Sequence, residues 1–268
     1  MQTTTFQNNK NIALNIQNTI NIISNHMNLK SITTFFFVFL IGIISSKAQY
    51  VKLPESLKEN SEILPVKGRN GIQINQVITF GDFKTSKIKK GWTKTSKFTS
   101  SATSVSSSSQ KFSFVQNGPN NIAADVACLG ELSKIDIEII KNLFSIGTDF
   151  KSCFTGSITI SETEIWDFII IDPEKKPDNG SSSGFIRKEN SELIELFAST
   201  ELEGKKIPKF LQGVVQGYEF RMADEPIGIV SLYNKGDVIL KNGLPDNIKL
   251  VIASLSTALL VKADLNDQ

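Results

Sequence analysis

Hydrophobic and polar residues alternate with a period of two in several stretches of the chain. The alternation is clear at Phe112 and Phe114, at Ile158 and Ile160, and along Ile135–Ile139. Because successive side chains of a strand point to opposite faces, each stretch predicts a half-buried strand. Gly71–Phe83 alternates similarly until Gly81 and predicts another such strand.

Longer apolar runs mark further strands. Trp166–Ile171 is almost continuously apolar and ends at Asp172-Pro173, which predicts a central strand. Three short runs follow near the carboxyl end, at residues 214–222, 227–233 and 238–240, separated by turn sequences. Turn residues at such close spacing predict an antiparallel meander.

The last element has a different pattern. Asp246 follows Leu244-Pro245 and is placed to cap a helix, and Leu250–Val261 carries no charge. A helix that is apolar on nearly every face must be buried on nearly every face. This run is shorter than the roughly 20 apolar residues that cross a bilayer, so we expect it inside the protein, surrounded by sheet. A final strand is the alternative interpretation.

These elements predict a mainly β (α+β) fold. We expect an antiparallel β-barrel or sandwich packed around the hydrophobic C-terminal helix. A two-sheet β-sandwich without a central helix is the alternative.

The amino-terminal region has the pattern of an export signal. Met27-Asn28-Leu29-Lys30 is followed by an apolar run, Ile32–Ile44, and by small residues up to Ala48. A basic head, an apolar core of about 7–15 residues and small residues at the cleavage site are typical of a signal peptide. We therefore expect cleavage between Ala48 and Gln49, with an uncleaved anchor as the main alternative.

This interpretation divides the chain into three parts. Residues 1–26 contain no acidic residue and no core-forming pattern, so we expect a disordered lead or a misassigned upstream extension. Residues 27–48 are the expected signal peptide, and residues 49–268 a single exported β-rich domain. Its expected location is periplasmic, outer-envelope-associated or secreted, without a transmembrane helix in the mature chain.

Removal of the leader changes the charge and the available chemistry. The whole chain has 29 basic and 27 acidic side chains; the leader holds Lys10, Lys30 and Lys47 and no acidic residue, so 26 basic and 27 acidic side chains remain. No basic block interleaved with aromatics points to a nucleic-acid partner. The single histidine, His26, lies in the leader. The mature domain therefore lacks Ser-His-Asp, Cys-His and His-rich zinc arrangements, and we expect no cofactor and no metal.

Two residue groups remain as candidates for covalent or catalytic chemistry. Cys128 and Cys153 are the only cysteines, and in an exported chain an even pair predicts a disulfide. The richest acidic region contains Trp166 and four carboxylates: Glu162, Glu164, Asp167 and Asp172. Paired carboxylates of this kind would suit a histidine-independent hydrolase, perhaps one acting on carbohydrate. Alternation along a strand gives Glu162 and Glu164 one shared face, which on most sheets is simply solvated.

The candidate binding residues are Trp92, Arg69 and Asp82, which lie near one another in sequence. Arginine is scarce in this lysine-rich chain, where only Arg69, Arg187 and Arg221 occur. The planar guanidinium suits a bidentate partner in a way that lysine does not. A core or strand-edge position for Trp92, and surface or paired positions for the arginines, are the alternatives.

The meander followed by one hydrophobic terminal helix, over roughly Val214–Leu265, resembles the tubby-like barrel, in which a closed sheet wraps a C-terminal helix. The segment from Phe80-Gly-Asp-Phe-Lys-Thr-Ser to Gly91-Trp92-Thr93 resembles a segment of uncharacterised exported proteins of Bacteroidetes-type bacteria, and so does the leader end Ser46-Lys-Ala-Gln. The barrel resemblance implies binding of a lipid or a partner at the envelope. We therefore expect a non-enzymatic binding or structural protein of the cell envelope, with a lipid or another protein as its partner; the hydrolase is the alternative.

Overall fold

The computed structural model describes residues 51–71, 75–90, 112–129, 153–171, 182–188, 192–204, 207, 209 and 213–266. Gln49–Gln268 form one unit, whose first residue follows the predicted cleavage site. The expected lead and signal peptide, the expected strand at Ile135–Ile139, Trp92 and Asp172 lie outside the described residues.

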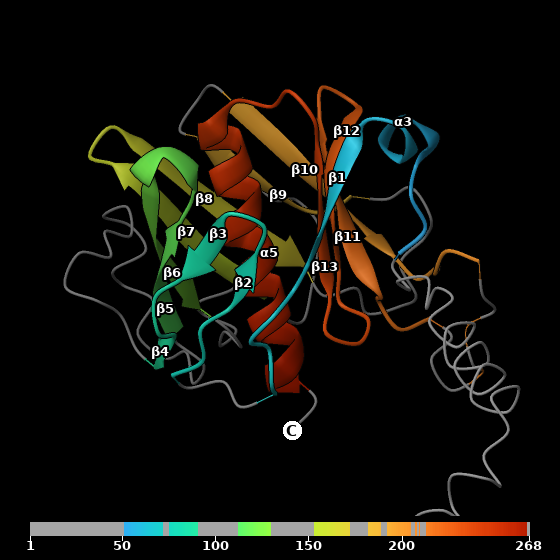
Figure 1. The fold of residues 1–268 in the computed structure, drawn as a ribbon, viewed down its shortest axis with the longest axis horizontal. Coiled ribbons are helices and arrows are strands. Elements are labelled where there is room, and N and C mark those ends of the chain that lie inside the picture. Colours follow the sequence, from blue (N-terminus) through green and yellow to red (C-terminus); the bar gives the residue numbers. More distant parts are fainter. Residues whose placement is uncertain are drawn as a thin grey trace, which may run out of the picture. The chain divides into compact units, whose positions relative to one another are not determined.

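Thirteen strands of the described chain form one antiparallel sheet, in the order β1-β13-β12-β11-β10-β9-β8-β7-β6-β5-β3-β2, with β4 also paired to β5 (Figure 1). The strands are β1 (Ser61–Pro65), β2 (Thr79–Phe80), β3 (Phe83–Thr85), β4 (Lys89–Lys90), β5 (Phe112–Asn117), β6 (Ala123–Leu129), β7 (Cys153–Ser161), β8 (Glu164–Ile171), β9 (Ser182–Lys188), β10 (Glu192–Ser199), β11 (Gly217–Met222), β12 (Glu225–Ser231) and β13 (Asp237–Lys241). Most neighbours in the sheet are neighbours in sequence, as hairpin connections require.

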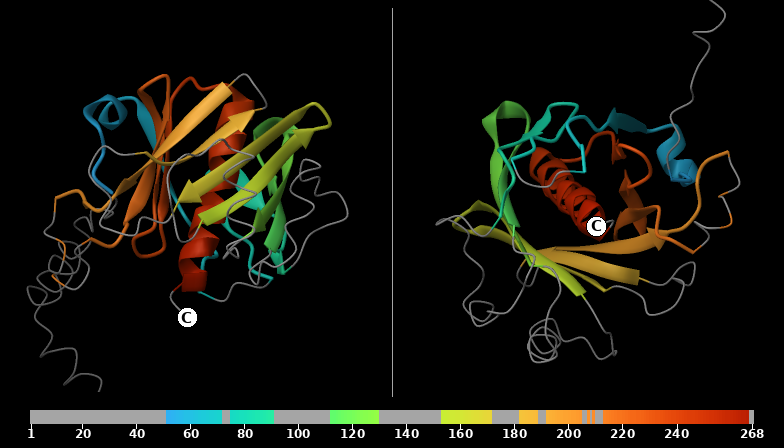
Figure 2. Two further views of the ribbon diagram at one scale, coloured as in Figure 1. Left: turned by 180° about the vertical axis from the view of Figure 1, so that it is seen from behind. Right: turned by 90° about the horizontal axis from the view of Figure 1, so that it is seen from below.

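The two ends of this sheet meet. Just beyond β1, the backbone N–H of Lys67 donates to the carbonyl oxygen of Thr79 in β2 at 2.8 Å, and the N–H of Thr79 donates back at 3.0 Å. The sheet therefore curves into a nearly closed barrel, seen from below in Figure 2. β1 joins the sheet far out of sequence order, because it pairs with β13 from the other end of the domain.

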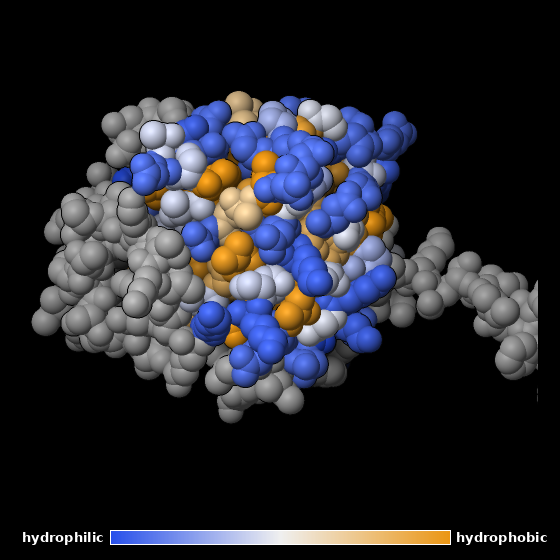
Figure 3. All heavy atoms as spheres, turned by 60° about the vertical axis from the view of Figure 1, so that its left-hand side comes forward, coloured by the Kyte–Doolittle hydropathy of each residue, from blue (hydrophilic) through white to orange (hydrophobic). Residues whose placement is uncertain are grey.

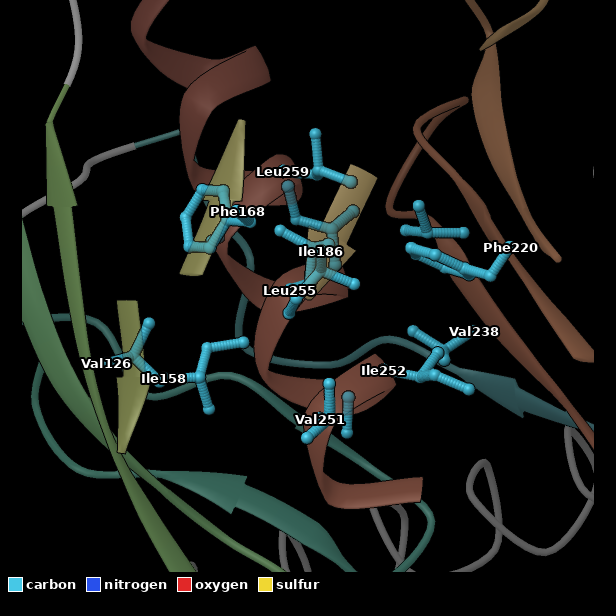
Figure 4. Packing of buried hydrophobic residues seen from close by; sticks show 14 of the residues in the cluster. Val126, Ile158, Phe168, Ile186, Phe220, Val238, Val251, Ile252, Leu255 and Leu259 are labelled. Carbon is cyan, nitrogen blue, oxygen red and sulfur yellow. The ribbon is translucent and has the colours of Figure 1, made fainter. Parts of the chain in front are cut away.

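The interior of the barrel is filled by helix α5 (Asp246–Asn266). Side chains from the sheet pack around its Val251, Ile252, Leu255 and Leu259 (Figure 4), among them those of Val126, Ile158, Phe168, Ile186, Phe220 and Val238. All of these residues are at most 1 % exposed. The predicted barrel around a C-terminal helix is confirmed, and the alternatives of a sandwich without a helix and of a final strand are wrong.

The amino-terminal end of α5 is fixed by polar contacts to two hairpins. The Nδ2 of Asn120, in the β5–β6 connection, donates to Asp246 Oδ2 at 2.8 Å. The Nδ2 of Asn247 donates to Glu164 Oε1, at the start of β8, at 3.0 Å. Small residues within the helix, Ala253 and Ala258 among them, are fully buried and allow the sheet to approach closely.

A short segment before β1 covers part of the outer face. Val51, Leu53 and Leu57, the last within helix α3 (Glu55–Lys58), form a second buried cluster with Ile229 of β12 and Ile239 of β13. Side chains of β12 and β13 alternate between this cluster and the cluster around α5, so both faces of these strands are buried here.

Several strand predictions are confirmed in detail. The meander is present as β11, β12 and β13, and β8 ends at Ile171 as expected. The strand predicted for Gly71–Phe83 is wrong as a single element: residues 72–74 lie outside the described part, and the range contains the strand Thr79–Phe80 and, after a turn, the start of β3 at Phe83. Gly81, at a φ of 51°, starts the turn into β3, so the end of the predicted stretch folds as a hairpin.

One buried hydrogen bond links the helix to the sheet. Thr257 Oγ1 donates to Gln116 Oε1 at 2.8 Å, and both side chains are fully buried. Replacing Thr257 with valine keeps the shape but leaves the amide oxygen without this donor, so we expect a loss of about 1–3 kcal/mol in the free energy of unfolding. Urea unfolding of the wild type and of Thr257→Val measures this loss. In the Gln116→Leu background the same replacement is expected to cost much less; an equal cost in both backgrounds would show that the bond contributes nothing.

Candidate functional site on the outer face of the barrel

The position of α5 limits where a site can lie. Helix side chains occupy the space that a ligand would fill in an open barrel, and both they and the strand residues around them are buried. A partner of the described domain must therefore bind at the outer face or at the ends of the barrel. On the face shown in Figure 3, apolar and hydrophilic residues are interspersed.

The predicted disulfide is not formed: Cys128 and Cys153 are both buried thiols. Cys128, in β6, lies opposite Gly156, three positions along β7 from Cys153. That offset separates the two Cα atoms by about 10 Å along the strand, beyond the roughly 7 Å that a disulfide can bridge. Cys128 also belongs to the cluster around α5, whereas alternation directs Cys153 to the outer face. Burial raises the pKa of the Cys128 thiol well above its usual value, which keeps it protonated.

The three predicted binding residues do not form one described site. Trp92 lies outside the described residues. Arg69 is engaged with the β12–β13 connection: its Nη1 donates to the carbonyl oxygens of Leu232 at 3.0 Å and Asn234 at 3.2 Å. Asp82 is exposed in the turn between β2 and β3. Arg69 therefore holds a loop, and the binding roles of Trp92 and Asp82 stay predictions.

Within the acidic region, Glu164 has a structural role. Glu164 Oε1 accepts hydrogen bonds from Asn247 and, at 3.3 Å, from the indole nitrogen of Trp166, and lies 3.8 Å from Lys188 Nζ. Glu162 lies in the turn between β7 and β8, so the expectation that it shares a strand face with Glu164 is wrong. The Glu164 carboxylate joins the start of α5 to the sheet.

A different group of residues, half-buried except for the exposed Leu193, lies together on the outer face of the described sheet. We call it the arginine–phenylalanine face. It lies on the outer side of three adjacent strands, β9, β10 and β11, where the register brings the following side chains together: Phe185, Arg187, Leu193, Phe197, Glu219 and Arg221. Their neighbours in sequence, such as Ile186, Ile194 and Phe220, point inward to α5.

Arginine stacks on phenylalanine twice in this face. The guanidinium carbon of Arg221 lies 4.4 Å from the ring centre of Phe197, and that of Arg187 lies 5.9 Å from the ring centre of Phe185. Arg221 Nε also contacts Glu219 Oε1 at 2.5 Å. These contacts orient the Arg221 side chain, which is still 34 % exposed, so it loses little freedom when a partner binds.

The composition of the face suits a protein partner. Leu193, 49 % exposed, is the most exposed large hydrophobic side chain of the described chain. Arginine and aromatic residues are enriched where protein interfaces gain most of their energy. Glu219 and Glu195 compensate the positive charge of the two arginines, so the face has no excess charge to attract a polyanion.

We also searched the described part of the chain for a metal site and for a membrane-spanning helix. It contains no group of three or more His, Cys, Asp or Glu side chains that could hold a metal ion. Within it, no helix has the length and apolar character needed to cross a membrane. Comparison with protein-family models, with curated proteins and with solved structures finds no match to this chain.

Burial raises the pKa of Asp237, a described carboxylate at the start of β13. The native state therefore holds its proton at a pH where the unfolded chain, with an ordinary pKa of 3.8, has lost it. Stability falls as the pH rises from about that value through the native pKa, and the loss persists at neutral pH. Asp237→Asn is therefore expected to raise the free energy of unfolding at pH 7, and by less at pH 4.

Urea unfolding at the two pH values measures this effect. Asp82→Asn, at an exposed position, is the matched control and is expected to change stability little at either pH. A lower stability of Asp237→Asn at pH 7 would show that the charged carboxylate is stabilising.

Two members of the arginine–phenylalanine face stand out in the sequence, but the sequence does not show that they lie together. Arg187 and Arg221 stood out because arginine is scarce, but they are 34 positions apart, and only the register of β9, β10 and β11 brings them to one face. No short motif carries that register, since it depends on where each hairpin turns.

Proposed function

We propose that this chain is an exported, non-enzymatic binding protein of the cell envelope or extracellular space, and that its arginine–phenylalanine face binds another protein. One observation carries the proposal. Arg221 is held by the Phe197 ring and Glu219, on the same outer face of the sheet as the exposed Leu193, and the interior of the barrel is filled by α5. Arginine and aromatic side chains are common energetic centres of protein interfaces.

A protein is preferred to a lipid for two reasons. In the described domain, side chains of α5 pack against the strand side chains where an acyl chain would have to lie inside the barrel. On the outer face, Glu219 already pairs with Arg221, which weakens the attraction of that arginine for an anionic headgroup. The resemblance to tubby-like barrels, which implies a lipid or a partner at the envelope, stays a prediction.

Export is the sequence-based part of the proposal and has its own test. The pattern of residues 27–48 predicts that the exported protein begins at Gln49. Amino-terminal sequencing of protein recovered outside the cytoplasm would give Gln-Tyr-Val as the first residues. Recovery of the chain only in the cytoplasm, with residues 27–48 intact, would contradict export.

Site-specific photo-crosslinking in the cells that produce the protein tests the binding face. A photoreactive amino acid at Leu193 is expected to give one discrete protein adduct, and the same residue at Asn242, exposed after β13, is expected to give none. Adding Arg221→Lys keeps the charge but removes the planar stacking on Phe197, so it should abolish the adduct. A lipid adduct, equal adducts at both positions, or no adduct at Leu193 would overturn the proposal.

A further inference from the structure

Strand β1 has one edge without a backbone partner, and the hydrogen-bond pattern shows which groups this leaves. The N–H of Val66 donates to Gly236, and the N–H of Asn242 donates to the carbonyl oxygen of Asn60. The backbone N–H and C=O groups that face β13 therefore belong to every second residue from Asn60 to Val66, that is, Asn60, Glu62, Leu64 and Val66. This agrees with the register of β1 and β13. The N–H and C=O groups of Ser61 and Ile63, and the C=O of Pro65, face away from β13.

Pairing on this second side stops after one bridge. Lys67 and Thr79 exchange two hydrogen bonds, and the next pair of the ladder would be Pro65 with Gly81. Pro65 has no N–H to donate, and Gly81 turns the chain away into β3. Among the residues that the structure describes, no backbone group pairs with Ile63 on this side.

The unpaired stretch is accessible from outside. Ile63 is one of the few exposed large hydrophobic residues, at 38 % exposed, and its side chain lies on the outer face. In Figure 1 the ribbon of α5 is visible between β1 and the β2–β3 hairpin. The side chains of α5 from Leu250 to Val261 are nevertheless buried, so the core is closed and only the backbone edge is open.

We propose that this edge of β1 binds an extended segment of another protein, which adds a short antiparallel or parallel strand to the barrel beside Ser61 and Ile63. Only a polypeptide in extended conformation offers N–H and C=O groups at the spacing that this edge requires. The site is separate from the arginine–phenylalanine face and rests on backbone geometry, so each can fail without the other.

The surroundings define the sequence that fits. The residue opposite Ile63 places its side chain on the outer face next to the exposed isoleucine and is therefore apolar. Glu62, within the stretch, and Asp82, in the turn after Gly81, are both exposed, and Gly81 lies against the Leu64 side chain. Lysine or arginine beside the apolar residue would pair with these carboxylates, and the turn at Gly81 limits the added strand to about three paired residues.

Proline substitutions separate this role from folding. The N–H of Ile63 points away from β13, so Ile63→Pro is expected to leave the melting temperature nearly unchanged, as the natural Pro65 two positions along indicates. The N–H of the exposed Glu62 points to β13 and is lost in Glu62→Pro, so this variant is expected to have a lower melting temperature than the wild type. Equal melting temperatures of the two variants would show that the assignment of the edges is wrong.

The binding experiment selects from a library of random heptapeptides displayed on phage, with residues 49–268 as target. Peptides with alternating apolar and basic residues are expected to be enriched, and to lose at least tenfold in affinity for Ile63→Pro while binding Arg221→Lys normally. Selected peptides that bind Ile63→Pro equally well, or no enrichment over the starting library, would overturn the proposal. So would self-association of the wild type in sedimentation that Ile63→Pro abolishes, because the edge would then bind a second copy.

Discussion

Replacing Leu255 with alanine is expected to destabilise the protein by about 3–5 kcal/mol, because the residue lies in the middle of α5 and is fully buried among strand side chains. The cost combines lost burial of the leucine with the cavity that remains, and a nearly closed sheet has little freedom to collapse into it. For a domain of this size, this loss corresponds to a fall in melting temperature of roughly 6–20 °C.

Leu193→Ala is the matched control for this substitution. It makes the same chemical change on the outer face, where the side chain is about half exposed, and we expect a loss of less than about 0.5 kcal/mol. Thermal and urea unfolding of both variants give the comparison. Similar losses for the two variants would contradict a helix enclosed by the sheet.

Gly156→Ala is expected to be at least as severe, for a steric reason. Gly156 lies in β7 between Cys128 of β6 and Phe168 of β8. A Cβ atom there would lie 2.3 Å from the carbonyl oxygen of Ala127 and 2.4 Å from the Phe168 ring. The backbone of one strand must move to make room, so we expect a loss of about 3 kcal/mol or more, or failure to fold.

Gly118→Ala provides the comparison within the same barrel. Gly118 has an extended backbone, and an added Cβ would come no closer than 3.3 Å, to the flexible side chains of Ile122, Leu250 and Phe83. We expect less than about 1 kcal/mol of destabilisation, because such side chains can shift. Soluble expression and the unfolding midpoints of both variants measure the difference, and a Gly156→Ala protein as stable as Gly118→Ala would show that β6, β7 and β8 do not pack as described.

The elements that sequence predicts well are those whose pattern is local. The alternation at Phe112 and Phe114 gives β5, and the uncharged run Leu250–Val261 lies within α5, although the helix extends from Asp246 to Asn266. Because no face of that run is polar, its enclosure by sheet also followed from the sequence.

The features that could not be predicted from the sequence depend on contacts between distant segments of the chain. The pairing of β1 with β13 joins the two ends of the domain, and no local pattern around Ile63 indicates it. The disulfide prediction failed because the count of two cysteines says nothing of register, and here the register separates Cys128 from Cys153. For the same reason, no sequence pattern predicts the face that contains Phe197 and Arg221, because the pairing of β10 with β11 creates it.

Native-state amide hydrogen exchange along α5 tests the central claim most directly, namely that a helix at the end of the chain forms the interior of the barrel. If the sheet encloses it, amides between Val251 and Val261 open only when the whole domain unfolds, and their exchange gives the same free energy as urea unfolding. Exchange within seconds to minutes, as in a helix that frays from a terminus, would contradict the enclosed helix and reopen the barrel interior as a place for a ligand.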